Sequence, residues 1–208
     1  MLTHAWARLH GMTLDQLALK HATDKSSHDH DYCRHYEHLL SPLPAAPFTL
    51  LEIGVAYGAS LRMWAEWLPQ ATIIGLDNDA DRPCWRGDPP RIQVIIGDQT
   101  SPHDLTLLKT HGPFQVIVDD GGHLPHQHLA SFDALWPALS PGGWYIIEDL
   151  PTVFWPHVLH LPNILSTLWA RLDSILRTDD TIQEIHIIAG STGQLTLDGI
   201  LLLRKRLT

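Results

Sequence analysis

Short apolar runs rich in β-branched residues recur along the chain from residue 48 onward, and polar or amphipathic segments separate most of them. This alternation is typical of a parallel sheet whose strands are joined by helical crossovers. The expected strands span residues 49–53, 72–76, 92–96, 114–118 and 144–147.

The last two apolar runs, residues 185–189 and 200–204, break this rhythm. Too few residues separate them for a helix, so we expect them to pair as an antiparallel hairpin. The whole pattern predicts an α/β fold. It is a Rossmann-like, doubly wound, mostly parallel seven-stranded sheet with a C-terminal antiparallel hairpin and a short helical N-terminal cap.

Several helices carry start signals. Thr13, followed three residues later by Gln16, forms a capping-box pattern that opens a short helix over residues 14–20. Ser101 with Pro102 directly after it predicts the start of the helix that follows the third strand. Further helices are expected after Leu124 and from an Asn163 cap to Leu176.

The segment before the first strand is expected to be a helical cap. A second helix is predicted over residues 31–40, and a Pro-rich stretch, 41–47, then leads into the sheet. We therefore expect residues 1–47 to be a cap that belongs to the same domain as the main body, residues 48–208.

The composition is that of an ordinary globular protein, with 44% apolar and 18% charged residues. A net charge of −9 argues against a nucleic-acid partner, because phosphate binding depends on Lys and Arg. No apolar run reaches the length of a membrane span, and the N-terminal residues lack the continuous apolar region of a secretion signal. Cys33 and Cys84 are expected to be free thiols in a cytoplasmic protein.

Two glycines, Gly54 and Gly58, join the first strand to the segment that follows it. Glycine there allows a sharp turn and a close approach to a ligand at the carboxyl edge of the sheet. Asp77 ends the second strand, close to the ~20-residue spacing at which a carboxylate accepts ribose hydroxyl groups. A tight turn and a helix cap are the structural alternatives, but the combination favours a nucleotide-like cofactor.

Glu52 precedes this turn, and Ala56 stands where the dinucleotide fingerprint has its middle glycine. A carboxylate there disfavours a pyrophosphate but tolerates a cationic ligand, which favours S-adenosylmethionine over NAD. Asp98 and Gln99 follow the third strand and suit the adenine, although a cap for the next helix explains Asp98 equally well. The expected cofactor-binding residues are Glu52, Gly54, Gly58, Ser60, Asp77, Asp98, Gln99 and Asp119.

Two acidic pairs follow two successive strands: Asp119 with Asp120, and Glu148 with Asp149. Carboxylates that converge at one edge repel one another unless a cation is present, and oxygen ligands suit Mg²⁺. His123 follows Asp120 across two glycines and can reach the same place, where it could take a proton from a hydroxyl. Turn caps and a surface histidine are the alternative. Two acidic pairs at consecutive strand ends favour the metal site.

These motifs resemble the bacterial metal-dependent sugar O-methyltransferases of natural-product pathways, which are class I S-adenosylmethionine-dependent enzymes. The resemblance extends from Thr23-Asp24-Lys25 through the acidic pairs to the closing hairpin. It implies that residues 48–208 form the catalytic domain. The large auxiliary N-terminal domain of the family's type member is not in this chain, so its substrate and its oligomer contacts do not carry over.

The same resemblance assigns roles to the acidic and histidine residues. It implies that Asp120, Glu148 and Asp149 bind Mg²⁺, and that His123 acts as the catalytic base next to Asp120. Lys25 could pair with the cofactor carboxylate or lie over the active site, but a surface position is the commoner outcome and is what we expect.

The expected activity is the transfer of a methyl group from S-adenosylmethionine to a hydroxyl of a small molecule, such as a sugar or another natural product. Two alternatives remain open at this point. One is an NAD-type Rossmann oxidoreductase or sugar-modifying enzyme, and the other is a family member that binds the cofactor without transferring methyl groups. The expected partner is a small-molecule hydroxyl acceptor, not nucleic acid or a membrane, and a homo-oligomer stays open.

Overall fold

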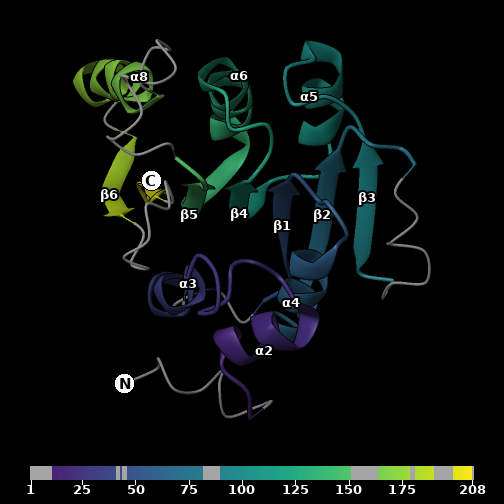
Figure 1. Ribbon diagram of the computed structural model, residues 1–208. Coiled ribbons are helices and arrows are strands. Elements are labelled where there is room, and N and C mark those ends of the chain that lie inside the picture. Colours follow the sequence, from purple (N-terminus) through teal and green to yellow (C-terminus); the bar gives the residue numbers. More distant parts are fainter. Residues whose placement is uncertain are drawn as a thin grey trace, which may run out of the picture.

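A seven-stranded sheet in the order β3-β2-β1-β4-β5-β7-β6 forms the centre of the molecule (Figure 1). The strands are parallel except for β7, which runs antiparallel to both of its neighbours. The predicted fold class and C-terminal hairpin are therefore confirmed. The computed structural model describes residues 11–40, 43, 46–81, 90–150, 164–178, 181–189 and 199–207.

The strands begin and end close to where the apolar runs do. Their bounds are β1 (Phe48–Ile53), β2 (Ala71–Asp77), β3 (Ile92–Ile96), β4 (Phe114–Asp119), β5 (Leu139–Ile147), β6 (Ile182–Ala189) and β7 (Gly199–Lys205).

Strand β5 differs most from its prediction, because it begins at Leu139 rather than at residue 144. Its first residues include Pro141 and two glycines, which favour a turn in sequence. The register with β4 shifts between Phe114 and Val116, which shows an irregularity where this stretch joins the sheet.

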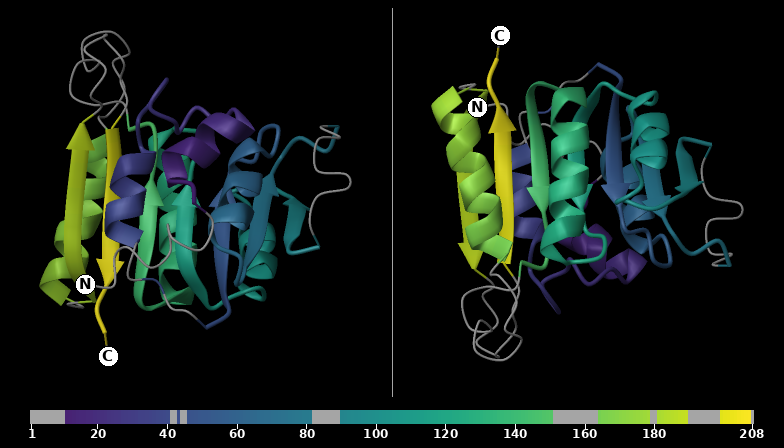
Figure 2. Two further views of the ribbon diagram at one scale, coloured as in Figure 1. Left: turned by 90° about the horizontal axis from the view of Figure 1, so that it is seen from below. Right: turned by 90° about the horizontal axis from the view of Figure 1, so that it is seen from above.

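Helices cover both faces of the sheet, and Figure 2 shows each layer in turn in front of the strands. One face carries α2 (Leu14–His21), α3 (Cys33–Leu40) and α4 (Ala59–Trp67). The other carries α5 (Pro102–Lys109), α6 (Pro125–Leu135) and α8 (Ile164–Thr178), with the short 3-10 helix η2 (Trp136–Ala138) after α6. None of the described helices is both long and apolar enough to cross a membrane.

The predicted helix starts at Thr13 and Ser101 are confirmed. Thr13 Oγ1 accepts a hydrogen bond from the Gln16 backbone N–H, and the Gln16 side chain accepts one from the Thr13 N–H in return. Ser101 Oγ accepts a hydrogen bond from the backbone N–H at position 104. Helix α3 begins two residues later than predicted, because Asp31 has a left-handed φ of 57° that a helix cannot include. The expected cap Asn163 lies outside the described residues.

The N-terminal helices share their apolar core with the sheet. Leu17 of α2 and Tyr36 of α3 belong to the same buried cluster as Trp64 of α4 and Leu50 of β1. A second buried cluster fills the opposite face beneath α5, α6 and α8. Residues 11–40 are thus packed directly on the sheet, close to the edge at which its parallel strands end.

Candidate active site

The ends of the central strands meet at one edge of the sheet. The register pairs Ile53 of β1 with Asp119 of β4, and Asp119 with Ile147 of β5. The residues that follow each strand therefore lie side by side, as expected for the ligand-binding edge of an open parallel sheet.

A cavity of about 330 Å³ opens at this edge. Among the described residues, no lysine or arginine lines it, whereas five carboxylates do. Such a lining attracts cations and repels phosphates. The lining carboxylates belong to Asp24, Asp77, Asp98, Asp120 and Asp149.

The turn after β1 depends on its glycines in two different ways. Gly54 has a φ of 85°, and a Cβ there would lie 1.9 Å from the backbone oxygen of Asp120. Gly58 has a φ of 71° at the start of α4, but a Cβ there would make only ordinary contacts. Position 54 therefore excludes any side chain by close packing, whereas position 58 requires only an unusual backbone conformation.

Asp77 lines the cavity and also holds this turn in place. Its Oδ2 accepts hydrogen bonds from the backbone N–H groups of Val55 and Ala56, at 2.8 and 3.0 Å. Its Oδ1 accepts one from Asp79 N–H at 2.9 Å. The structural alternative for Asp77, a residue that holds a turn, is therefore correct, and the carboxylate also lines the cavity.

Glu52 and Ser60, two of the predicted cofactor residues, lie beneath the turn and not on the cavity wall. The Glu52 side chain is fully buried. Burial raises the pKa of Glu52 to about 7, and the Lys25 ammonium, 3.5 Å from Oε1, opposes part of this rise. Glu52 is therefore a buried titratable group with no direct access to the cavity.

Asp98 and Gln99 both line the cavity, as predicted. Asp98 Oδ1 also accepts hydrogen bonds from the N–H and hydroxyl of Thr100, in the turn before α5. The N-cap of α5 is Ser101, so Asp98 does not cap that helix. Gln99 has a structural contact too. Its Oε1 accepts a hydrogen bond from Gly122 N–H at 2.7 Å, and its Nε2 donates to Asp119 Oδ1 at 3.2 Å.

Asp119 is fully buried and does not line the cavity, which argues against its predicted contact with the cofactor. Ser131 Oγ donates a hydrogen bond to Asp119 Oδ2, and the Tyr145 hydroxyl donates another at 3.3 Å. Successive residues of a strand point to opposite sides, so Asp119 faces the interior while Asp120 faces the cavity. The carboxylate of Asp119 thus links β4 to α6 and β5.

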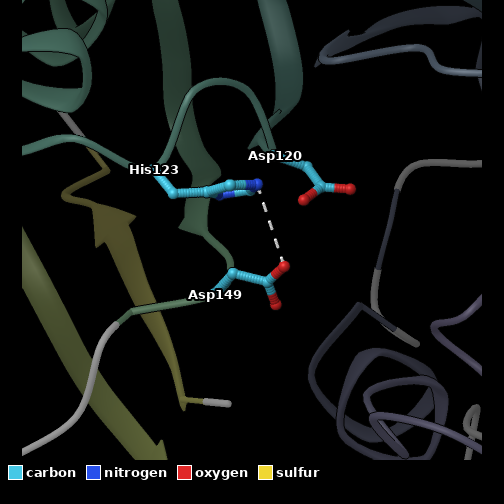
Figure 3. A group of neighbouring side chains, drawn as sticks. All are labelled: Asp120, His123 and Asp149. Atoms are coloured by element: carbon cyan, nitrogen blue, oxygen red, sulfur yellow. Dashed lines mark ion pairs between the residues drawn. The ribbon is translucent and has the colours of Figure 1, made fainter. Parts of the chain in front are cut away.

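Asp120, His123 and Asp149 come together at the cavity, and their side chains point toward one another (Figure 3). One ligand atom from each lies within 4.8 Å of the others. His123 Nε2 is 3.9 Å from Asp149 Oδ2. His123 and Asp149 have left-handed φ values of 54° and 48°, which are uncommon outside glycine and often occur at functional sites.

Glu148, the third predicted metal ligand, faces the interior side of this group. It is 1% exposed, and its two oxygens already have partners. Lys25 Nζ donates to Oε2 and the Tyr36 hydroxyl donates to Oε1, each at 2.5 Å. The structure thus brings Asp120 and Asp149 to the cavity and holds Glu148 behind them.

The prediction that Lys25 is a surface residue was wrong. Its side chain is 1% exposed, and its Nζ also lies 2.6 Å from Asp120 Oδ2. Burial by itself lowers the pKa of Lys25, but the carboxylates of Asp120 and Glu148 outweigh burial and raise it well above its usual value. Lys25 is therefore a buried ammonium inside the acidic group.

Sequence reasoning also missed Tyr32 and Tyr36. The Tyr32 hydroxyl donates a hydrogen bond to Asp149 Oδ1 at 2.9 Å, in addition to the contact of Tyr36 with Glu148. Tyr36 lies in α3 and Tyr32 directly precedes this helix, four residues earlier, which is the spacing at which side chains at a helix start lie on one side. The spacing of these two tyrosines, a few residues after Lys25, was the feature of the sequence that could have indicated their role.

This chain matches known methyltransferases in sequence and in fold. The family described as a methyltransferase domain matches residues 51–150. The MycE methyltransferase from the mycinamycin biosynthetic pathway, solved in complex with Mg, SAH and mycinamycin VI, superposes on 94% of this chain and 55% of its own. The TM-score of this superposition is 0.79, and the two sequences are 28% identical. The chain belongs to the class I methyltransferase family.

Two curated methyltransferases show the extent of the sequence match. The 8-demethyl-8-alpha-L-rhamnosyl tetracenomycin-C 2'-O-methyltransferase of Streptomyces olivaceus is 37% identical over 148 residues, which is 67% of this chain and 38% of that protein. The mycinamicin VI 2''-O-methyltransferase of Micromonospora griseorubida is 36% identical over 151 residues, 69% of this chain and 37% of that protein. The aligned part of this chain thus spans less than two-fifths of either relative.

Proposed function

We propose that this class I methyltransferase transfers a methyl group from S-adenosylmethionine to a hydroxyl of a small molecule, with Mg²⁺ and with His123 as general base. The observation that carries the proposal is the meeting of Asp120, His123 and Asp149 at a cavity that also contains the glycine turn. The proposed base and the proposed cation ligands therefore lie next to the turn that is expected to bind the nucleoside part of the cofactor.

The cavity wall supports S-adenosylmethionine over NAD. A sulfonium and an ammonium suit the five carboxylates of the wall, whereas a pyrophosphate would meet no lysine or arginine among the described lining residues. Asp77 can accept further hydrogen bonds from a ribose, because a carboxylate has about four acceptor sites. Gly54 and Gly58 would then lie near the methionine part of the cofactor.

The acidic group supports a divalent cation of the Mg²⁺ type. Asp120 and Asp149 offer hard oxygen ligands from the cavity wall. Glu148, the third proposed ligand, lies behind them with its oxygens bonded to Lys25 and Tyr36. The donor set fits Mg²⁺, which uses one or two carboxylates and keeps its other positions for water and substrate. Such an ion would lower the pKa of a hydroxyl that binds to it.

The exposure and position of His123 support its proposed role as the base. Its side chain is 42% exposed, and its Nε2 faces Asp149 at 3.9 Å. The proton passes from the acceptor hydroxyl to Nε2, and the acceptor oxygen forms a bond to the methyl carbon. The bond between that carbon and the sulfur of S-adenosylmethionine would break, and sulfur would keep the electron pair. The protein contributes chiefly by aligning oxygen, carbon and sulfur before the reaction.

The proposed acceptor is a sugar or another natural product with a free hydroxyl. The names of the two curated relatives support this class, since one acts on a rhamnosyl tetracenomycin and the other on mycinamicin VI. Because the match spans less than two-fifths of those proteins, the choice of acceptor is a proposal for the class and not for one compound.

The direct test incubates the chain with S-adenosylmethionine, Mg²⁺ and a panel of deoxysugar-bearing natural products and catechols, and follows the products by mass spectrometry. We expect the mass of one methyl group to be added to at least one acceptor, and excess EDTA to abolish the reaction. Full turnover by metal-free protein would contradict the role of the cation. Calorimetric binding of NAD but not of S-adenosylmethionine would favour the oxidoreductase alternative.

A further inference from the structure

Three hydrogen-bond donors from one short segment reach the three carboxylates of the proposed cation site. Lys25 contacts Asp120 and Glu148, Tyr36 contacts Glu148, and Tyr32 contacts Asp149. Lys25 and Tyr32 lie in the loop between α2 and α3, and Tyr36 lies in α3, whereas the carboxylates follow β4 and β5.

We propose that Lys25, Tyr32 and Tyr36 are positioning residues for the cation site, so that the N-terminal cap takes part in the active site. This inference rests on the proposed function, which supplies the cation. Groups that hydrogen-bond to metal ligands fix the orientation of those ligands, and losing one typically weakens metal binding about 10- to 100-fold.

The segment that carries the donors is itself fixed. Its own backbone hydrogen bonds hold the loop, with Asp31 N–H donating to the Ser26 oxygen at 2.8 Å and Cys33 N–H donating to the Lys25 oxygen at 3.1 Å. The Tyr36 ring packs at 5.6 Å from the Trp64 ring of α4. The backbone of the loop and the ring of Tyr36 are therefore held by contacts other than those with the carboxylates.

Tyr32 and Lys25 restrain the two carboxylates that line the cavity. One oxygen of Asp149 accepts from Tyr32, and its other oxygen, Oδ2, faces His123. Lys25 holds Asp120 by Oδ2, at 2.6 Å. In each case the inner contact orients the carboxylate and leaves its other oxygen for a ligand in the cavity.

Lys25 and Tyr36 together hold Glu148 by both of its oxygens. Lys25 is also 3.5 Å from Glu52, so its single ammonium faces three carboxylates. Without this positive charge, the buried carboxylates would repel one another and move apart. The lysine thus keeps them close enough to act as one site.

The test measures Mg²⁺ binding to the full chain by isothermal titration calorimetry for wild type, Tyr32→Phe and Tyr36→Phe. Each substitution removes one hydroxyl and keeps the ring. The control is Tyr145→Phe, which removes a buried hydroxyl that donates to Asp119, a carboxylate off the cavity wall. We expect about 10- to 100-fold weaker Mg²⁺ binding in the first two variants and unchanged binding in the control.

Thermal unfolding without Mg²⁺ separates positioning from stability. A hydroxyl with only a structural role lowers the melting temperature, as Tyr145→Phe should, and leaves Mg²⁺ affinity at the wild-type value. Wild-type Mg²⁺ affinity in both Tyr32→Phe and Tyr36→Phe would overturn the inference, and if Tyr36→Phe does not fold, Tyr32→Phe decides alone. Absence of Mg²⁺ binding in the wild type would instead overturn the cation requirement of the proposed function.

Discussion

Gly54 packs against Asp120 so closely that a Cβ on Gly54 would lie 1.9 Å from the Asp120 backbone oxygen. Asp120 N–H also donates a hydrogen bond to the backbone oxygen of Ile53 at 2.9 Å. The glycine turn therefore packs directly against the backbone of the proposed cation site. A substitution in the turn is expected to change the position of Asp120.

Gly54→Ala should accordingly weaken the binding of both S-adenosylmethionine and Mg²⁺, because the new methyl group must push Asp120 away from the turn. Gly58→Ala is the control, since a Cβ there meets only ordinary contacts and the cost is limited to its left-handed backbone. Calorimetric titrations with each ligand check this. Equal effects of the two substitutions on Mg²⁺ affinity would contradict the coupling.

Lys25→Met should lower the free energy of unfolding by about 3–5 kcal/mol, because removing one partner leaves buried carboxylates without a counter-charge. Lys20→Met is the matched control. Lys20 is 48% exposed and pairs with Glu66 on the surface, so its loss should cost no more than about 1 kcal/mol. Urea unfolding followed by circular dichroism measures both values, and equal losses would refute the buried role of Lys25.

Glu52 should give the protein a pH-dependent stability. Because burial raises its pKa to about 7 in the folded state, the folded chain binds more protons than the unfolded chain between pH 4.5 and 7. The contribution of Glu52 to stability therefore falls as pH rises through this interval and is constant above it. In Glu52→Gln, unfolding free energies measured across the same interval should decline less steeply, and an unchanged slope would count against the assignment.

His123→Ala should lower kcat by about a hundred- to ten-thousand-fold, the usual contribution of a general base. Affinity for S-adenosylmethionine and the melting temperature should change little, because the side chain is 42% exposed and faces the acidic group. His103→Ala, at an 83% exposed position of α5, controls for removal of an imidazole. Wild-type turnover in His123→Ala would end its role as the base.

The regular part of the fold was predictable from local patterns, whereas contacts between distant segments were not. The β3 prediction, 92–96, matches the strand, because a short run rich in β-branched residues favours a strand even at the edge of the sheet, where no residue of β3 is fully buried. The start of β5 was missed, since its Pro and Gly residues favour a turn and join the sheet only through a register shift with β4. The C-terminal antiparallel hairpin was predicted from the two apolar runs at the end of the chain, whereas the position of β7 between β5 and β6 was not predicted.

For the site, the sequence indicated which residues gather at the sheet edge but not which way each one faces. Asp119 and Asp120 are residues of the same type, and only the orientation of β4 decides that Asp119 faces the interior and Asp120 faces the cavity. Lys25 was misjudged because hydropathy places a lysine in a polar loop at the surface. Its partners follow it by about a hundred residues, as Asp120 and Glu148, and no local pattern reports such a contact.

The buried ammonium of Lys25 also bears on whether the chain must bind an ion before it can fold. A cluster of carboxylates without any positive charge would depend on a bound divalent ion to fold, as many small metalloproteins do. Here the chain supplies a counter-ion of its own, which reaches Glu52, Asp120 and Glu148. If the proposed Mg²⁺ site is occupied, the chain would therefore not need the ion in order to fold, and it would lose and rebind the ion without unfolding.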